Sequence, residues 1–145
     1  MKHLPERALI IRSPHIEKVL AGTKTWEIRS RPTNIRGPIG LIRSGSGLVV
    51  ATGEVVDCRG PLSFQEFKRN ALRAGWKPAE ITQRPYPTTY AWVLNNVKVL
   101  PTPLAYRHPR GTITWVKLTA AVMRPQGARS DTPLATRTPS RSRAK

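Results

Sequence analysis

The pattern of apolar and polar residues predicts a chain of short strands with two brief helices between them. Residues 7–12 are apolar and β-branched between two arginines, which is typical of a buried strand. The run 48–56 is the strongest strand in the chain, and Gly53 within it is a candidate bulge or point of close backbone approach. Further strands are predicted at 39–43, 88–94, 97–100 and 113–118.

Turn residues separate these strands. The glycine- and serine-rich residues 44–47 have the length of a hairpin loop. Asn95 and Asn96 predict a turn between the strands 88–94 and 97–100. The proline-containing segment 101–111 is predicted to be irregular.

Two helices carry recognisable start and stop signals. Ser13 is a candidate N-cap with Pro14 as the first helical residue, and Gly22 is the expected C-terminal stop. In the second helix, Ser63 and Glu66 have the spacing of a capping box. This helix is expected to run to about residue 74 and to stop at Gly75.

Five or six strands with two short flanking helices and no βαβ alternation predict an α+β, mainly β fold. The expected architecture is a small mixed sheet that closes, or nearly closes, into a barrel. Residues 1–120 form this domain. Residues 121–145 have the basic, Pro-, Ser- and Arg-rich composition of a disordered tail.

Charge points to a polyanionic partner. The formal net charge is +17. The tail from Arg124 onward has six basic residues against Asp131, a net +5, which leaves +12 on the domain. Nucleic acid is therefore the first partner to consider and an anionic membrane the second. The tail alone could also dock on an acidic protein partner.

Other features narrow the class of protein. No apolar run is long enough to span a bilayer, and the N-terminus lacks the apolar core of a secretory signal. Cys58 is the single cysteine, so no internal disulfide can form, and a cytoplasmic location is predicted. His3, His15 and His108 have no metal-ligand spacing, so neither a metal nor a cofactor is predicted.

Residues 24–31 form the best candidate site, because they place charged side chains on a short strand beside apolar ones. Strand alternation puts Trp26 and Ile28 on one face and Glu27 and Arg29 on the other. Lys24 lies at the helix–strand junction. Of the four tryptophans, Trp26, Trp92 and Trp115 are expected in the core, whereas Trp76 fits either the core or a stacking surface.

Residues 22–29, Gly-Thr-Lys-Thr-Trp-Glu-Ile-Arg, fit the G-x-K-x-x-E-x-R signature of the ASCH domain, a member of the PUA-like superfamily. Residues 53–58 resemble the family's G-x-V-x-x-C/I strand, and residues 62–67 its following helix. Residues 90–94 resemble its Y/F-x-W/F-x-L strand, and residues 111–116 its closing segment. The resemblance covers roughly residues 7–119.

The resemblance implies a PUA-like β-barrel with a cleft lined by the signature residues, and a function in binding RNA or other nucleic acid. Some members look like enzymes: one bacterial branch hydrolyses an acetylated cytidine, and another member has been described as a ribonuclease. The acetylcytidine branch matches Lys24 but has Thr where this chain has Glu27. Its further carboxylate falls where this chain reads Lys-Arg-Asn-Ala-Leu-Arg, at 68–73.

Two interpretations of the motif remain open. In the first, Lys24, Glu27, Arg29, Ser30 and Arg31 bind nucleic acid, with RNA favoured over DNA: the cations take phosphate or a base edge, and Glu27 accepts hydrogen bonds from a base or ribose. In the second, Glu27 and Arg29 form an ion pair that closes the barrel end, and Lys24 is solvated.

A hydrolase acting on RNA or a modified nucleoside, of the ribonuclease or amidohydrolase type, is the alternative function. Lys24 would then be the catalytic base, with its pKa lowered by burial. Glu27 beside it opposes that shift, and no nucleophile is evident, so binding is the preferred interpretation over an enzyme.

Overall fold

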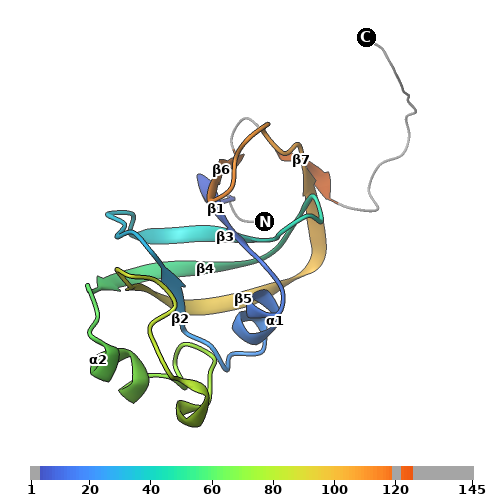
Figure 1. Cartoon of the computed structure of the whole chain (residues 1–145). Helices are drawn as coiled ribbons and strands as arrows, with labels where there is room; N and C mark the ends of the chain where they lie inside the picture. Colours follow the sequence, from blue (N-terminus) through green and yellow to red (C-terminus); the bar gives the residue numbers. More distant parts are fainter. Residues whose placement is uncertain (1–3, 119–121, 126–145) are drawn as a thin grey trace.

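Two long neighbouring strands, β4 (Leu48–Arg59) and β5 (Tyr90–Tyr106), form the centre of the fold (Figure 1). The computed structural model describes residues 4–118 and 122–125. The other elements are β1 (Arg7–Ile11), α1 (His15–Leu20), β2 (Trp26–Arg29), β3 (Gly37–Arg43), α2 (Phe64–Arg69), the 3₁₀ turn η1 (Pro78–Glu80), β6 (Trp115–Lys117) and β7 (Val122–Pro125).

The strands form one mixed, curled sheet in the order β2-β5-β4-β3-β1-β6, with β7 added to β5. Strands β1 and β3 are parallel, and every other pairing in the described chain is antiparallel. The expected class, a mainly β fold with a barrel-like sheet and two short helices, is confirmed. The ladder leaves β2 at one edge and β6 at the other.

Bulges between β4 and β5 bend the sheet. Gly53 lies at one of them, where a side chain would come within 3.3 Å of Val97, so its expected role as a point of close approach is confirmed. At this point Thr52 pairs with Lys98 and Glu54 pairs with Asn95, which leaves one extra residue on β5. Extra residues of this kind increase the local twist and bend a strand.

The predicted turn at Asn95–Asn96 is wrong. The chain does not reverse there, because β4 remains paired with β5 on both sides of the two asparagines. Asn96 instead takes a positive φ of 55° as part of the bulge. Asn is one of the few residues that adopts this conformation readily, so the same chemistry that favours turns here accommodates an extra residue.

The boundaries of β5 and of the tail also differ from expectation. β5 continues to Tyr106 through part of the segment 101–111, with a register shift between the pairs Val49–Leu104 and Ala51–Val99. Pro101 and Pro103 fall in this shift, since proline cannot donate to a ladder. β7 pairs with β5 and lies past residue 120, and residues 126–145, the rest of the predicted tail, fall outside the described chain.

Helix α1 ends as predicted but begins differently. Its stop is a Schellman arrangement: Gly22 N–H donates to the Val19 carbonyl, Thr23 N–H donates to the Lys18 carbonyl, and Gly22 has φ +83°. The predicted N-cap is wrong, because the Ser13 hydroxyl donates to Glu17 Oε2 at 2.8 Å and no side chain caps the helix.

Helix α2 has the predicted capping box. Ser63 Oγ accepts from Glu66 N–H at 3.0 Å, and Glu66 Oε1 accepts from Ser63 N–H at 2.8 Å. The helix ends at Arg69 rather than near residue 74. Asn70 interrupts it, because its side-chain amide donates to the Glu66 carbonyl at 2.8 Å. Hydrogen-bonded turns continue to Gly75, where φ is +87°.

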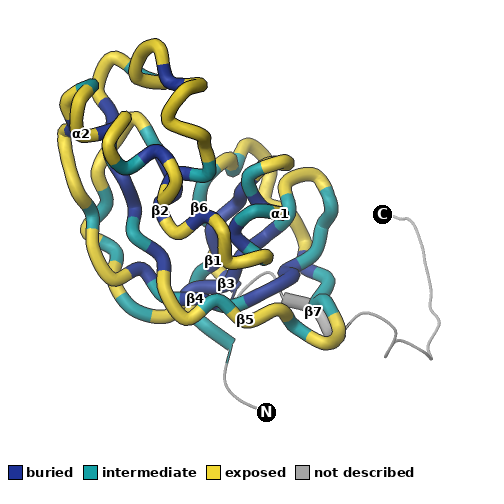
Figure 2. Tube along the Cα trace, turned by 90° about the horizontal axis from the view of Figure 1, so that it is seen from below, coloured by how far each residue is buried: buried dark blue, intermediate teal, exposed yellow. Residues whose placement is uncertain are grey.

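Three apolar clusters hold the fold together, and buried residues follow the strands (Figure 2). The first lies between the sheet and α1, and the third packs α2 against β2. β1 supplies the first cluster with Leu9 and Ile11 and the second with Ala8 and Ile10, so it is buried on both faces. Trp26 and Trp92 are buried, as expected, and half-buried Trp115 stacks on Trp92.

The capping box provides a test of the fold with an internal control. Ser63→Ala removes the hydroxyl that accepts from Glu66 N–H, so we expect a loss of about 1 kcal/mol in the free energy of unfolding. Ser13→Ala removes no cap, and its cost should stay below about 0.5 kcal/mol. Urea denaturation of both variants measures the difference. Equal losses would contradict the assignment of the cap.

Candidate functional site

The turn after α1 leads directly into β2, an edge strand that contains most of the charged motif. Because Gly22 ends α1, the chain enters β2 within a few residues, and β2 pairs antiparallel with β5. The predicted alternation is confirmed: Trp26 and Ile28 belong to the cluster under α2, and Glu27 and Arg29 contact one another on the opposite side. The edge strand thus separates an apolar face from a charged one.

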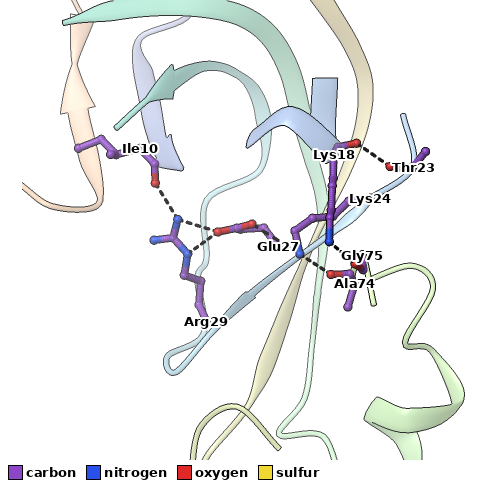
Figure 3. A network of polar contacts seen from close by, with 8 residues as sticks. All are labelled: Ile10, Lys18, Thr23, Lys24, Glu27, Arg29, Ala74 and Gly75. Carbon is purple, nitrogen blue, oxygen red and sulfur yellow. Dashed lines mark hydrogen bonds and ion pairs between the residues drawn. The ribbon is translucent and has the colours of Figure 1, made fainter. Parts of the chain in front are cut away.

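Glu27 lies between two cations, as Figure 3 shows. Its Oε2 accepts from Arg29 Nε at 3.0 Å and lies 2.9 Å from Arg29 Nη2. Its Oε1 lies 3.9 Å from Lys24 Nζ. Arg29 Nη2 also donates to the Ile10 carbonyl at 2.8 Å, which joins β2 to β1. Glu27 is only 5% exposed, so this ion pair is shielded from solvent screening.

Lys24 is buried rather than solvated, with 2% of its surface exposed. Its Nζ donates to the Ala74 carbonyl at 2.7 Å, and Lys18 Nζ donates to the neighbouring Gly75 carbonyl at 2.7 Å (Figure 3). The two lysines therefore tether the turn that follows α2. The second interpretation of the motif is right about the ion pair and wrong about a solvated Lys24.

Burial lowers the pKa of Lys24 to about 8, because the ammonium loses most of its hydration. The Glu27 carboxylate raises this pKa, as the sequence suggests, but its effect is smaller than that of burial. The positive charges of Lys18 and Arg29 add to the lowering. Lys24 is thus an ammonium at neutral pH that sits close to its own titration range.

A cleft of about 900 Å³ opens above these charges. Its lining comes from β1 and the β1–α1 junction, from β2 and the residues before it, and from the β3–β4 loop. The segment between α2 and β5, the last residue of β5 and the residues that follow it complete the lining. Besides Lys24, Glu27 and Arg29 it is lined by Ile10, Arg12, His15, Ile28, Ser44, Gly45, Ser46, Gly47, Trp76, Pro85, Tyr86, Tyr106, His108, Thr112 and Ile113.

Two buried polar atoms of cleft residues, Glu27 Oε1 and His15 Nδ1, have no hydrogen-bond partner within the described residues. Burial, followed by the charge of Lys24, lowers the pKa of His15, so the neutral imidazole is favoured near pH 7. Buried polar atoms are nearly always paired in folded proteins. Glu27 Oε1 is therefore an acceptor beside the cleft that the described residues leave without a hydrogen bond.

Aromatic side chains flank the charged floor. Trp76 is 37% exposed, and its ring lies 6.2 Å from the His15 ring and 5.5 Å from Lys18 Nζ. Tyr86 and Tyr106 are further lining residues, and the Tyr106 hydroxyl lies 2.8 Å from His108 Nδ1. Trp76, which the sequence left open, thus lies in the cleft wall, where a planar ring could stack on it.

The predicted site residues divide into two groups. Lys24, Glu27 and Arg29 meet in the cleft, whereas Ser30 and Arg31 are exposed and are not among its lining residues. The Arg31 carbonyl accepts from Trp92 Nε1 at 2.9 Å, so this residue helps to position a core tryptophan.

Sequence reasoning missed Arg12, His15 and Tyr86 as cleft residues. They come from segments that only the sheet topology brings together. The one local signal is the position of His15 in the first turn of the helix that leads into the motif.

No group of three or more His, Cys, Asp or Glu side chains is arranged to hold a metal ion in residues 4–118 and 122–125. No helix in the same part of the chain is long and apolar enough to cross a membrane.

Comparison with known proteins assigns the chain to a type of domain. A family model described as the ASCH domain matches residues 9–103. The structure is similar to the crystal structure of ASCH from Zymomonas mobilis, with a TM-score of 0.55 and 13% identity, over 81% of this chain and 96% of that one. At this identity the likeness shows the fold alone. No curated protein matches the chain.

The shifted pKa of Lys24 can be measured directly. In a titration followed by the ¹³Cε signals of lysine, one resonance should have its midpoint near pH 8 and should be absent from Lys24→Met. Because the folded-state pKa lies below the unfolded value of 10.5, the unfolded chain binds more protons between pH 8 and 10.5. The free energy of unfolding of the wild type relative to Lys24→Met should therefore rise across this window. A flat difference would contradict the burial of the ammonium.

Proposed function

Since the chain belongs to the ASCH domain family, we propose that it binds nucleic acid, RNA in preference to DNA, with a single-stranded or flipped-out nucleotide in the cleft. The observation that carries the proposal is the buried Glu27 carboxylate. Its Oε1 has no hydrogen-bond partner in the described chain, and Glu27 is a lining residue of the cleft of about 900 Å³.

The chemistry of Glu27 suits a nucleotide. Ionised, the carboxylate only accepts hydrogen bonds, so Oε1 would take an N–H of a base or the 2′-hydroxyl of a ribose. A ribose hydroxyl at this position would favour RNA over DNA. Arg29 holds the other carboxylate oxygen, so the carboxylate cannot rotate freely before the ligand arrives. This fixed orientation reduces the entropy that binding must overcome.

The remaining lining supports the same ligand class. Trp76 and Tyr86 supply faces on which a base could stack, a contact worth about 1–3 kcal/mol per base in other proteins. Arg12 adds a second guanidinium to the cleft, and the whole chain carries a net +17. A field of this sign raises the local concentration of polyanions, and release of their counterions would make affinity fall with salt.

Lys24 has an indirect role in this proposal. Its Nζ is engaged by the Ala74 carbonyl and lies near Glu27 Oε1, so it sets the charge of the cleft floor without offering a free phosphate contact. Arg29, with 19% of its side chain exposed, is the most accessible of the three charged residues of the motif.

The role of the cleft in binding can be tested with two arginines that are close in sequence, of which one lines the cleft and the other does not. Arg29→Gln and Arg31→Gln each remove one positive charge, but only Arg29 lines the cleft. We expect Arg29→Gln to weaken binding of single-stranded RNA roughly tenfold, and Arg31→Gln by less than about twofold, since exposed charges contribute little. Fluorescence anisotropy with a labelled oligonucleotide measures both.

Circular dichroism should first establish that Arg29→Gln is folded, because this variant also removes a partner of Glu27. Arg29→Lys keeps the charge and loses the planar fork, so it should bind with intermediate affinity. Equal losses for the Arg29 and Arg31 variants would remove the cleft from the explanation and leave only the general positive charge.

A second candidate function, hydrolysis of RNA or of a modified nucleoside, is favoured by one observation, the pKa of Lys24 near 8. A general base works best when its pKa lies near the working pH, and a deprotonated Lys24 could accept a proton from an attacking water. Against the acetylcytidine reaction stands Glu27, which occupies the position of a hydroxyl in that branch.

The pH dependence separates this function from pure binding. If Lys24 is the base, product formation from RNA or from acylated nucleosides should rise with pH and level off above about 8, as the ammonium deprotonates. Lys24→Met should abolish it, whereas Lys98→Met, an exposed control, should not. Chromatography of the reaction mixture detects the product, and its absence with every substrate would refute the hydrolase.

A further inference from the structure

A second basic surface lies on the side of β2 that faces away from the cleft. There, Trp26 lines a hollow of about 250 Å³ together with Arg59, Arg69 and Arg73. Leu62, Glu66 and Asn70 complete its lining. The hollow shares no lining residue with the cleft, whose floor is made by Glu27, the next residue along β2.

The three arginines start from fixed positions of the backbone. Arg59 is the last residue of β4 and pairs with Ala91 of β5, and Arg69 is the last residue of α2. The Arg73 carbonyl accepts from Thr25 N–H and from Trp26 N–H, both at 2.9 Å. Side chains that project from hydrogen-bonded backbone are better suited to a built site than those on loops.

Trp26 orients two of the guanidinium groups. Arg59 and Arg73 lie 5.8 Å and 5.9 Å from the centre of the Trp26 ring, within the range of a cation–π contact. Trp26 itself is 3% exposed and packed under α2, so the ring is a rigid support. The two cations are therefore held over one ring although they repel each other.

The hollow carries unbalanced charge. Glu66 is its one acidic lining residue, and Glu66 Oε1 is already occupied by Ser63 N–H in the capping box. None of the three arginines forms an ion pair with any described residue. Three positive charges against one negative charge leave a net +2 around a hollow of this size. An anion bound there would relieve the repulsion between the guanidinium groups.

We propose that this hollow binds a backbone phosphate of the same polynucleotide whose nucleotide enters the cleft. Guanidinium forks match phosphate oxygens bidentately, and a phosphate offers oxygens to more than one arginine at once. β2 is an edge strand of the sheet, with the cleft on one face and the hollow on the other. A single strand that passed over this edge would contact both. The identity of the polyanion rests on the proposed function; the anion site itself does not.

The test compares two double variants of the full chain that lose the same charge. Arg59→Gln with Arg69→Gln removes two lining residues of the hollow, and Lys98→Gln with Lys117→Gln removes two exposed lysines elsewhere in the sheet. Binding of a labelled single-stranded RNA oligonucleotide is measured by anisotropy over a salt series. We expect roughly a tenfold loss of affinity for the arginine pair and less than about threefold for the lysine pair. Because one phosphate contact is lost, the salt slope of the arginine pair should be smaller by about 0.7.

A second measurement is independent of RNA binding. Inorganic phosphate is titrated into the wild type while the Trp26 indole N–H and the arginine Nε–H signals are followed in ¹H–¹⁵N spectra. The signals of the hollow should shift in the wild type and remain still in the arginine double variant. Shifts without any RNA binding by the wild type would refute the proposed function and retain the anion site.

Other outcomes overturn the inference itself. Equal RNA weakening by the two double variants, together with unmoved Trp26 and arginine signals in phosphate, would show that the three arginines are ordinary solvated charges while the cleft still binds. If polyglutamate bound more tightly than RNA and lost affinity in the arginine variant, the hollow would instead belong to an acidic protein partner, and its assignment to a polynucleotide would be wrong.

Discussion

The hydrogen bond from Arg29 Nη2 to the Ile10 carbonyl is the contact that closes the curled sheet. β2 is one edge of the ladder, and β1 lies next to the opposite edge, so no strand pairing joins them within the described residues. Arg29 also lies 5.3 Å from the Trp92 ring, and Trp92 stacks on Trp115 of β6 at 5.7 Å. The side chain of Arg29, and not a ladder of backbone hydrogen bonds, thus connects β2 with β1, and space is left between these strands. The cleft is a consequence of this incomplete closure.

Closing the sheet with charges has a physical cost. Glu27 and Lys24 are 5% and 2% exposed, and removing charged groups from water costs several kcal/mol each unless partners replace the hydration. Arg29, the Ala74 carbonyl and the approach of Lys24 to Glu27 supply most of that replacement. They leave Glu27 Oε1 without a hydrogen bond, and an apolar pair would avoid this cost. The incompletely satisfied carboxylate at the floor of the cleft therefore does not serve stability, which agrees with the binding role that we propose for Glu27.

Features set by local chemistry could be predicted from the sequence. The capping box of Ser63 and Glu66, the stop at Gly22 and the alternation along β2 each depend on a few adjacent residues. Features that depend on strand pairing could not be predicted from the sequence. Asn95 and Asn96 have turn chemistry, yet β4 keeps them within a continuous strand. Arg12 and Tyr86 share a cleft with Glu27 only because the tertiary fold brings distant segments together. The same limit explains why Ser30 and Arg31, neighbours of Arg29 in sequence, are not cleft-lining residues, since the chain has left β2 by then.

The proton on Lys24 connects the binding and hydrolytic interpretations of the cleft. With a pKa of about 8, roughly nine tenths of the lysine is ammonium at pH 7, in which state it donates to Ala74 and balances Glu27. The amine has a free lone pair only in the remaining fraction, and its loss of charge leaves Glu27 with Arg29 as its one cationic partner in the motif. Deprotonation thus weakens the arrangement that holds the carboxylate in place. At neutral pH the geometry favours a fixed acceptor over a base, and for this reason binding is the function that we propose for the cleft.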